Sequence, residues 1–561
     1  MNIQTSLQTF RGKAAGQKPL LEVKGLQVSF STSQGRVNAV RDLSLQIAPG
    51  EIFALVGESG SGKSVTARTI IGLAGPRASV RADAITLATH DGRVLDLLDL
   101  SEKAWRRVRG REIGFVLQDA LVSLDPLRTI GREIAEPILA HGLAPRSLVS
   151  SQVLELLSRV GVPEPDVRAG QYAHELSGGL RQRALIASAL AAQPRLLIAD
   201  EPTTALDVSI QKRILAIFRE LADAGHGILL ITHDLAVAAQ LAHRVGVMQN
   251  GQLVETGPAH DVLSHPGHDY TRRLLAAVPT AANRGRHLSN PASPLPNRQT
   301  IRSDDRLLEV RNISKSFRRG DGSLLRAVKD ASLHVDRGET LGVVGESGSG
   351  KTTLGKIALA LQSPDSGAVL FEGRPWSSLP ERSRRPLRAG MQTISQDPLS
   401  SFDPRFTVER IIAQPLRLYT GLDRARRREK IVNLLELVGL SPDLLGRRPQ
   451  ALSGGQRQRV SIAQALAAAP KLLICDEPVS ALDVTTQAQV LDLLVDLQAR
   501  LGLSMIFISH DLGVIQHVSH RIVVMKEGAV VEAGAVEQVF GQPQHAYTRE
   551  LVASVPNFSN L

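Results

Sequence analysis

Short, wholly apolar runs recur along this 561-residue chain, and polar or glycine-rich residues follow them. An apolar run of about four to eight residues is typical of a strand buried on both faces of a parallel sheet. The runs are residues 52–56, 196–199, 228–231, 341–344, 472–475 and 505–508. Between them lie segments with helical apolar spacing, such as residues 153–160 and 431–440. Strands that alternate with helices predict an α/β doubly wound core.

Most of this pattern occurs twice, in the same order. The matching segments are residues 39–51 with 327–339, 176–183 (LSGGLRQR) with 452–459 (LSGGQRQR), and 200–207 (DEPTTALD) with 476–483 (DEPVSALD). The interval from Ser177 to Asp200 is 23 positions, and so is the interval from Ser453 to Asp476. A repeat this long predicts duplicated domains rather than a solenoid.

One interval differs between the copies. Lys63 and Gln118 are 55 positions apart, whereas Lys351 and Gln396 are 45 apart. The difference predicts an insertion in the first copy, near residues 87–98, in a surface segment.

The stretch between the copies, residues 280–305, is rich in Asn, Ser, Pro and Arg and has no apolar periodicity. This composition predicts a flexible linker. We therefore expect a flexible tail over residues 1–18, a first domain over 19–279, the linker over 280–305 and a second domain over 306–561.

Two glycine-rich segments directly follow apolar runs: residues 57–64 read GESGSGKS and residues 345–352 read GESGSGKT. In the pattern G-x-x-x-x-G-K-[ST], backbone N–H groups surround a polyphosphate, the lysine reaches the terminal phosphates and the hydroxyl binds Mg²⁺. The predicted nucleotide-binding residues are Gly57, Glu58, Ser59, Gly60, Ser61, Gly62, Lys63 and Ser64, and Gly345, Glu346, Ser347, Gly348, Ser349, Gly350, Lys351 and Thr352. Two such loops inside one repeat predict two nucleotide sites.

Bulk composition narrows the class of protein. No stretch approaches the roughly 18 apolar residues of a membrane span, and residues 1–19 lack the apolar region of a secretory signal. A single cysteine, Cys475, excludes an internal disulfide framework and suits a reducing compartment such as the cytoplasm. The net charge of +11 admits nucleic acid or an anionic membrane as a neighbour. The densest basic runs, residues 382–385 and 424–430, lack interleaved aromatics and read more simply as solvated helix faces.

Taken together, the phosphate loop, a glutamine, the LSGG segment, the Asp-Glu pair, the ALD segment and a trailing histidine resemble the ATP-binding-cassette (ABC) ATPases. Residues 118–126 (QDALVSLDP) and 396–404 (QDPLSSFDP) resemble a segment of the di- and oligopeptide importer ATPases. Residues 265–279 and 545–556 are similar to the tail of that family. The chain resembles two such subunits fused, as in some peptide, glutathione and microcin uptake systems. The resemblance implies two P-loop NTPase domains, each with a RecA-like core, an antiparallel β subdomain and a helical subdomain.

In this family two domains close head to tail, so each nucleotide lies between the phosphate loop of one copy and the LSGG signature of the other. The first site would comprise Lys63, Ser64, Gln118, Asp200, Glu201 and His233, with Ser453, Gly454, Gly455 and Gln456 from the second copy. The second would comprise Lys351, Thr352, Gln396, Asp476, Glu477 and His510, with Ser177, Gly178 and Gly179 from the first copy.

The resemblance also implies a role for each residue. ATP is the substrate, and Mg²⁺ is held by Ser64, Gln118 and Asp200 in one site and by Thr352, Gln396 and Asp476 in the other. Glu201 and Glu477 act as general bases on water, while His233 and His510 contact the γ-phosphate. The signature segments open helices whose N-termini favour the same anion.

Other positions have weaker assignments. Asp207 and Asp483 would bridge the two sites, and Phe30 and Phe317 are candidates to stack on adenine, although an ordinary core aromatic is the alternative. The sequence departs from the family at Asp125 and Asp403, which replace Asn, and at Leu180, which replaces Gln. We expect Leu180 to matter little, because the backbone and the serine of the signature make most of the phosphate contact.

Several residues have a simpler structural interpretation. His265 and His268 have metal-like spacing but no companion ligands, Cys475 reads as a small core residue, and Trp105 and Trp376 as packing residues. Family members often carry a cysteine-containing extension that this sequence lacks, so we expect no iron–sulfur cluster.

The favoured function is the ATPase of an importer of peptides or related solutes. Its partners would be two membrane permease subunits and an extracytoplasmic solute-binding protein, and the chain would lie at the cytoplasmic face of the inner membrane, with no nucleic acid bound. One alternative is a soluble tandem ABC ATPase acting on ribosomes or DNA, but such proteins typically have a long charged linker or zinc-finger insertions. An exporter ATPase is a second alternative, disfavoured by residues 118–126 and the tail.

Overall fold

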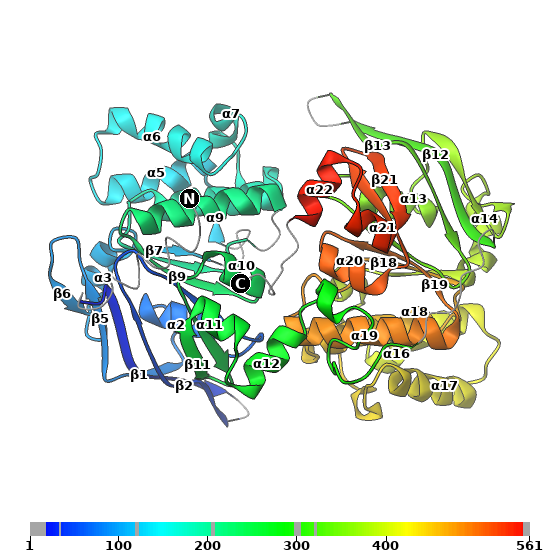
Figure 1. Cartoon of the computed structure of the whole chain (residues 1–561), viewed down its shortest axis with the longest axis horizontal. Coiled ribbons are helices and arrows are strands. Elements are labelled where there is room, and N and C mark those ends of the chain that lie inside the picture. Colours follow the sequence, from blue (N-terminus) through cyan, green and yellow to red (C-terminus); the bar gives the residue numbers. More distant parts are fainter. Residues whose placement is uncertain are drawn as a thin grey trace. The chain divides into compact units, whose positions relative to one another are not determined.

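A computed structural model describes residues 18–32, 35–117, 123–203, 208–296, 305–318 and 322–553. These residues form two compact units: unit 1 ends at Leu275 and unit 2 begins at Ala276. Each unit has one antiparallel sheet, one six-stranded sheet and a group of helices (Figure 1). The predicted α/β class and the duplicated domains are confirmed.

In unit 1 the antiparallel sheet has the order β2-β1-β5-β6, and β4 pairs with β1. Its strands are β1 (Leu21–Thr32), β2 (Gly35–Ile47), β4 (Ala78–Arg81), β5 (Ala84–Ala88) and β6 (Val94–Asp96). The second sheet has the order β11-β10-β3-β9-β8-β7, in which β11 is antiparallel to β10 and the other pairings are parallel. Its strands are β3 (Ile52–Val56), β7 (Ile113–Val116), β8 (Leu196–Asp200), β9 (Gly227–Thr232), β10 (Arg244–Gln249) and β11 (Gln252–Pro258).

The helices of unit 1 fall into two groups. Those that accompany the two sheets are α2 (Lys63–Ile70), α3 (Glu102–Val108), α9 (Val208–Asp223), α10 (Leu235–Leu241), α11 (Ala259–Ser264) and α12 (Asp269–Ala276). The helical subdomain contains α5 (Ile130–Ala140), α6 (Arg146–Arg159), α7 (Pro165–Ala169) and α8 (Gly178–Leu190). Within this group α5 packs on both α6 and α8.

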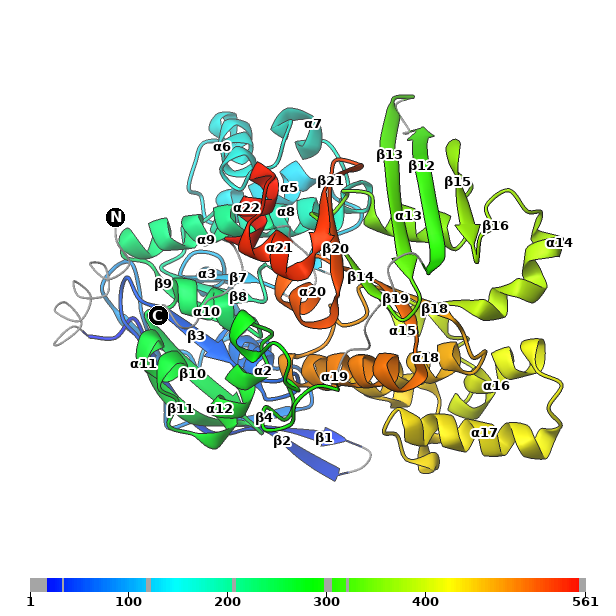
Figure 2. The same cartoon turned by 45° about the vertical axis from the view of Figure 1, so that its right-hand side comes forward.

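Unit 2 repeats this plan. Its antiparallel sheet, in the order β13-β12-β15-β16, contains β12 (Arg306–Arg318), β13 (Leu324–Asp336), β15 (Ser366–Phe371) and β16 (Arg374–Pro375), and β12 and β13 form its long hairpin (Figure 2). The six-stranded sheet, in the order β17-β18-β19-β14-β20-β21, contains β14 (Thr340–Val344), β17 (Met391–Ile394), β18 (Leu472–Asp476), β19 (Ser504–Ser509), β20 (Arg521–Lys526) and β21 (Ala529–Ala535).

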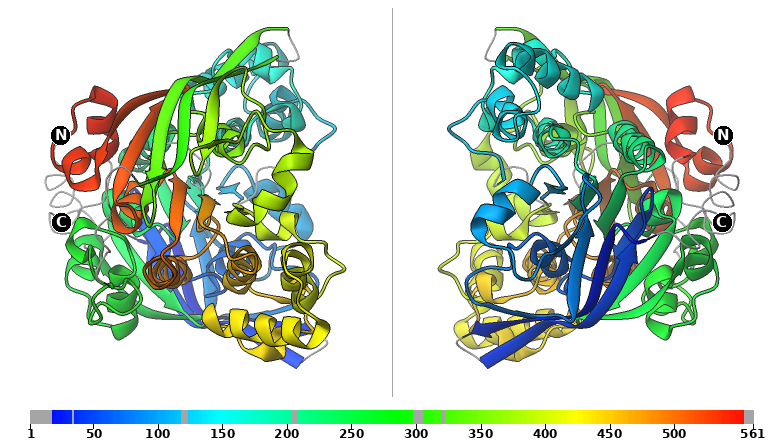
Figure 3. Two further views of the ribbon diagram at one scale, coloured as in Figure 1. Left: turned by 90° about the vertical axis from the view of Figure 1, so that its right-hand side faces the viewer. Right: turned by 90° about the vertical axis from the view of Figure 1, so that its left-hand side faces the viewer.

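The helices of unit 2 are α13 (Lys351–Ala358), α14 (Glu381–Arg384), α15 (Pro398–Ser401), α16 (Val408–Tyr419), α17 (Arg424–Leu437), α18 (Gly454–Leu466), α19 (Val484–Leu501), α20 (Leu512–Val518), α21 (Val536–Gly541) and α22 (Ala546–Val552). Helices α16 and α17 lie side by side, coloured yellow in Figure 3. The basic run at residues 424–430 opens α17 and is largely exposed, as the solvated-face interpretation predicts.

Alternation along the buried strands divides each unit between two apolar clusters. On β9, Ile228 and Leu230 pack with the helical subdomain, whereas Leu229 and Ile231 pack with the antiparallel sheet and α2. Because both faces of these strands are covered, every residue of β3, β8 and β9 is buried. This double burial is why the apolar runs predicted the strands correctly.

Part of the insertion predicted in the first copy lies in the hairpin between β5 and β6. In unit 1 the turn between β5 and β6 takes residues 89–93, whereas in unit 2 Glu372 and Gly373 connect β15 to β16. The antiparallel sheet of unit 1 also contains β4, which has no separate counterpart in unit 2, so the longer hairpin holds only part of the extra residues.

The segment between the copies differs from the expected flexible linker. Residues 276–296 belong to unit 2, where Leu288 is 1% exposed in the apolar core. The buried carboxylate of Asp492 on α19 accepts hydrogen bonds from the backbone N–H groups of Leu288 (2.9 Å) and Ser289 (2.8 Å) and from the Ser289 hydroxyl (2.6 Å). Arg284 pairs with Glu537 at 2.7 Å. Polar composition predicted a linker, but these side chains and backbone groups have partners in the folded unit.

In the described part of the chain, no helix has the length and apolarity that crossing a membrane requires.

We predict that Leu288→Ala lowers the free energy of unfolding of unit 2 by about 2–4 kcal/mol, because it leaves a cavity in a packed core. The matched control is Leu501→Ala, at a leucine that is 48% exposed, with an expected change within about 0.5 kcal/mol. Urea unfolding of the full chain measures both. Equal, negligible effects would show that residues 276–296 are a free linker.

A pH dependence follows from His287, whose ring contacts the Asp496 carboxylate at 3.1 Å. Burial lowers the pKa of His287, but Asp496, the Ser293 carbonyl and the Asp492 charge outweigh it and the pKa is raised. A raised folded-state pKa means that the contribution is fully present below the unfolded value of about 6.5 and is lost as pH rises through the folded value. We expect the free energy of unfolding to fall over that range and His287→Gln to flatten this part of the pH profile. An unchanged profile would exclude the ion pair as a source of stability.

Candidate functional site

The glycine-rich loops run so close to neighbouring backbone that some positions admit no side chain. Gly57 has φ 148°, and a Cβ on it would lie 2.2 Å from the Met248 carbonyl oxygen; a Cβ on Gly62, with φ 105°, would lie 2.4 Å from the Ala39 oxygen. Gly345 and Gly350 make the same approaches in unit 2, each at 2.2 Å. The loop therefore leads straight from a buried strand into α2 or α13, whose N-terminus favours an anion.

The lysine of each loop folds back onto that loop. Lys63 Nζ donates to the carbonyl oxygens of Gly57 and Glu58, both at 2.7 Å. Lys351 Nζ donates to Gly345 at 2.6 Å and Glu346 at 2.8 Å. Both lysines are buried, and burial lowers the pKa of Lys351 against the opposing charges of Glu477, Asp476 and Glu346. A buried cation in this position is suited to a polyphosphate.

The hydroxyl and the strand-end aspartate meet in both units. Ser64 Oγ donates to Asp200 Oδ1 and Thr352 Oγ1 to Asp476 Oδ1, each at 3.1 Å. Burial raises the pKa of both aspartates, against the hydrogen bonds from Ser64 and Thr352. The second oxygen of Asp200, Oδ2, is buried and has no hydrogen-bond partner among the described residues. A hydroxyl beside a buried carboxylate with a free oxygen lone pair is the oxygen donor set that Mg²⁺ prefers, so these residues fit that ion.

In each unit the residue after the strand-end aspartate is a glutamate, and it pairs with the histidine that follows the adjacent strand. His233 Nδ1 lies 3.1 Å from Glu201 Oε1, and His510 Nδ1 lies 3.2 Å from Glu477 Oε1. Burial lowers the pKa of His233, but Glu201 outweighs it and the pKa is raised. The Glu477 bond also raises the pKa of His510, while His510 and Lys351 together hold the pKa of Glu477 below its usual value despite burial. These neighbours favour the ionised form of Glu477.

Gln396 joins this group in unit 2, where its Nε2 donates to Glu477 Oε2 at 3.1 Å. Its counterpart Gln118 and the aspartate Asp207 lie outside the described residues. Asp483 caps α19, accepting the Thr486 N–H at 3.0 Å. Its bridging role stays a prediction.

The signature segments begin helices, as predicted. Ser177 caps α8 and Ser453 caps α18, each accepting the N–H of the residue three positions later, Leu180 or Gln456. In unit 2 the Gln456 side chain also accepts the Ser453 N–H at 3.1 Å, a bond that Leu180 cannot make. The remaining predicted residues, Gly178, Gly179, Gly454 and Gly455, form the first turns of these helices.

The two adenine candidates differ in exposure. Phe30 is half-buried against the apolar cluster of the antiparallel sheet in unit 1, whereas the Phe317 ring is 37% exposed and has Lys315 Nζ 5.7 Å from its centroid. Phe317 is therefore the more available stacking surface, and the role of both stays a prediction.

Sequence reasoning missed two tyrosines that touch the loops. Tyr270 on α12 accepts the Glu58 N–H at 3.2 Å, and Tyr547 on α22 accepts the Glu346 N–H at 2.9 Å. The available signal was the repeated Y-T-R in the two tails, but nothing in a sequence shows that a phenol will meet a backbone group about 200 positions away.

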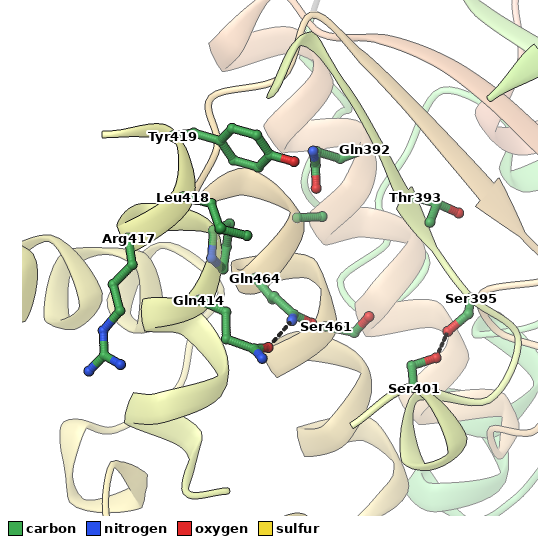
Figure 4. A pocket seen from close by; sticks show the side chains of 12 residues that line it. Gln392, Thr393, Ser395, Ser401, Gln414, Arg417, Leu418, Tyr419, Ser461 and Gln464 are labelled. Atoms are coloured by element: carbon green, nitrogen blue, oxygen red, sulfur yellow. Dashed lines mark hydrogen bonds between the residues drawn. The ribbon is translucent and has the colours of Figure 1, made fainter. Parts of the chain in front are cut away.

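A cavity of about 550 Å³ lies in unit 2 between β17, α16 and α18 (Figure 4). Gln414 and Gln464 line this cavity, point toward each other and form a 3.4 Å hydrogen bond. Ser395, which bonds Ser401 at 2.6 Å, lines the cavity and directly precedes Gln396. The cavity thus borders the strand end that carries the glutamine.

The structure also shows the surroundings of the residues that depart from the family pattern and of those expected to be core residues. Asp125 and Asp403 accept the N–H groups of Leu127 and Arg405 in Asx turns, which Asn would also form. Cys475 is fully buried, which raises its pKa to about 12 and confirms it as a core residue. The side chains of Trp105 and Trp376 are also buried.

The His268 ring accepts the Tyr270 N–H at 3.1 Å and so caps α12. Among the residues that the structure describes, no group of three or more His, Cys, Asp or Glu side chains is arranged to hold a metal ion.

Comparisons with known proteins match both copies of the sequence to one family. The ABC transporter family matches residues 40–204 and 328–480, and the family described as oligopeptide/dipeptide transporter, C-terminal region, matches residues 254–303 and 531–560. A glutathione import ATP-binding protein of Salmonella choleraesuis (strain SC-B67) is 42% identical over 560 residues, covering 96% of this chain and 90% of that protein. Its Escherichia coli (strain K12) counterpart is 42% identical over 557 residues, covering 96% and 89%.

Among solved structures, cbiO1 from Clostridium perfringens, part of the ABC transporter complex cbiONQ, is 29% identical and covers 43% of this chain and 92% of that chain, with a TM-score of 0.38. The family matches in both copies and the 42% identity over nearly the whole chain show that this protein belongs to the ABC transporter family, as a single chain with two ATP-binding domains whose hydrolysis of ATP powers transport.

Proposed function

We propose that this chain hydrolyses ATP at two magnesium-dependent sites to energise import of peptides or related small solutes through separate permease subunits. The observation that carries the proposal is that the same constellation assembles in each unit. In both, a buried lysine, a hydroxyl–aspartate pair and a glutamate–histidine pair lie at the ends of neighbouring buried strands, with distances that agree within about 0.1 Å. Import is supported by the relatives, which are named for glutathione import, and by the peptide-transporter C-terminal region.

Each residue has a chemical task in this proposal. The loop N–H groups and Lys63 or Lys351 bind the phosphates, and Ser64 with Asp200, or Thr352 with Asp476, holds Mg²⁺. Bound there, the metal ion neutralises charge on the transferring phosphoryl group. Glu201 or Glu477, each in contact with its histidine neighbour, accepts a proton from the attacking water. His233 or His510 then directs its second ring nitrogen toward the γ-phosphate, and Gln118 or Gln396 orients the water or the metal.

We further propose that each nucleotide is closed by the signature of the other copy. Ser453 would act on the nucleotide held by Lys63, and Ser177 on the nucleotide held by Lys351. The support is chemical: each serine opens a helix of 13 residues, and a helix N-terminus favours an anion.

The permease contact is proposed for the cavity between β17, α16 and α18. It borders Gln396, whose side chain bonds Glu477. An occupant of the cavity would therefore be linked to the general base through the Gln396 side chain. Leu418, at its rim, is 66% exposed and offers an apolar anchor to a permease segment. The other partner would be an extracytoplasmic solute-binding protein, and the chain would act at the cytoplasmic face of the inner membrane.

The pairing of signatures and loops can be tested one site at a time. With Lys351→Met, only the Lys63 site binds ATP, and Ser453→Ala should lower its affinity roughly ten- to 150-fold, because a hydrogen bond to a charged group contributes about 1.5–3 kcal/mol. Ser177→Ala, which removes the same kind of helix cap, is the matched control and should have little effect there. With Lys63→Met the two serines should exchange roles. Titration with a fluorescent ATP analogue measures all four; a larger effect of Ser177 in the Lys351→Met background would refute the pairing.

The docking surface can be tested with Leu418→Asp. We expect this change to abolish co-purification with the permeases and solute uptake while the ATPase rate of the isolated chain changes less than about twofold, because an exposed substitution costs little stability. Leu361→Asp is the control, at a leucine that is 60% exposed and does not line the cavity. Normal uptake with Leu418→Asp would exclude the cavity as the docking site.

Copurification with ribosomes that persists without permeases would count against import itself.

A further inference from the structure

Each phosphate loop is tied to the C-terminal tail of its own unit by one buried phenol. Tyr270 is 3% exposed and Tyr547 is 4% exposed, and their hydroxyl oxygens accept the N–H of Glu58 and Glu346, the second residue of each loop. The two contacts form independently, because the two units fold from different residues and each contact lies within one unit.

The N–H that each tyrosine holds belongs to the same peptide group as a carbonyl held by the lysine. Lys63 Nζ donates to the Gly57 oxygen at 2.7 Å, and the other end of the Gly57–Glu58 peptide donates to Tyr270. In unit 2, Lys351 donates to the Gly345 oxygen at 2.6 Å while the Glu346 N–H donates to Tyr547. A peptide group is planar and rigid, so fixing the direction of its N–H fixes the direction of its C=O. The tyrosine thereby sets where the lysine ammonium can sit.

The helices that carry the tyrosines are themselves held in place. In unit 1, Glu255 on β11 accepts the N–H groups of Gly267 at 2.7 Å and His268 at 3.2 Å, and His268 caps α12. In unit 2, Glu532 on β21 accepts the N–H groups of Gln544 at 2.8 Å and His545 at 3.0 Å, and His545 caps α22.

This arrangement fixes the tail against the edge strand of the core sheet. Because the phenol sits on a supported helix rather than on a free loop, it acts as a fixed hydrogen-bond acceptor.

We propose that Tyr270 and Tyr547 are positioning residues for ATP binding, each acting through one loop peptide on the phosphate-binding lysine. The inference deepens the proposed function and rests on its assignment of Lys63 and Lys351. It also gives a task to the tail helices, which lie in the segments that match the peptide-transporter C-terminal region. The alternative is that the phenols only pack beside the loop. In that case removal of the hydroxyl oxygen alone would not change the affinity for the nucleotide.

The test removes the hydroxyl and keeps the ring. In the Lys351→Met background, Tyr270→Phe should raise the dissociation constant of a fluorescent ATP analogue about three- to tenfold, and tenfold corresponds to about 1.4 kcal/mol. In the Lys63→Met background, Tyr547→Phe should do the same. Tyr172→Phe is the control, since Tyr172 is 40% exposed and lies outside both tails. Unfolding midpoints of all variants in urea report whether the fold is intact.

A double-mutant cycle separates positioning from general destabilisation. If Tyr270 acts through Lys63, Tyr270→Phe should weaken nucleotide affinity less in a Lys63→Arg variant of the Lys351→Met background, which keeps a cation at the site, than it does with Lys63 present, because coupled residues are not additive. Single-site backgrounds with normal affinity for Tyr270→Phe and Tyr547→Phe would overturn the inference. Lysine variants that fail to weaken ATP binding would instead overturn the proposed function. The two failures are therefore distinguishable.

Discussion

The approach of the phosphate loop to the neighbouring backbone is the constraint on which each site depends. Gly57 faces the end of β10 and Gly62 faces β2, at distances that leave no room for a Cβ. Because the loop is pressed into this position, Lys63 must fold back onto its carbonyls and Ser64 is presented to Asp200. A loop with a side chain at either glycine would have to move away from the strands, and the hydroxyl and the carboxylate would separate.

Unit 2 tests this reasoning within the same molecule. The loop contacts recur although the hydroxyl is Thr352 rather than Ser64, and the lysine, aspartate and histidine distances are preserved. Differences appear where the loop is not involved, such as the second capping bond of Gln456, which Leu180 lacks. The repeated distances therefore reflect the packing of the loop between strand and helix rather than the particular side chains around it.

The sequence predicted those parts whose signal is local. Buried strands covered on both faces give continuous apolar runs, and the phosphate loops need fixed residues at fixed spacing. The anchored segment around Leu288 was predicted wrongly as flexible, because its main partner, Asp492, lies 204 positions later and composition carries no trace of it. Tyr270 was missed for a related reason: its partner is a backbone N–H, which every residue except proline possesses.

Each site requires two adjacent residues, an aspartate and a glutamate, to serve the same nucleotide. Successive side chains of a strand point to opposite faces, yet Asp200 must reach Ser64 while Glu201 must reach His233. The chain resolves this by leaving the strand at the glutamate, which has φ 50° in unit 1 and 47° at Glu477 in unit 2. Left-handed backbone costs a non-glycine residue on the order of 1–3 kcal/mol, and it persists where the surroundings fix it. Here the N–H of each glutamate donates to the carbonyl of the penultimate residue of the adjacent strand, Ile231 or Ile508, at 2.9 Å. The fold itself therefore stabilises the geometry that brings metal ligand and general base together.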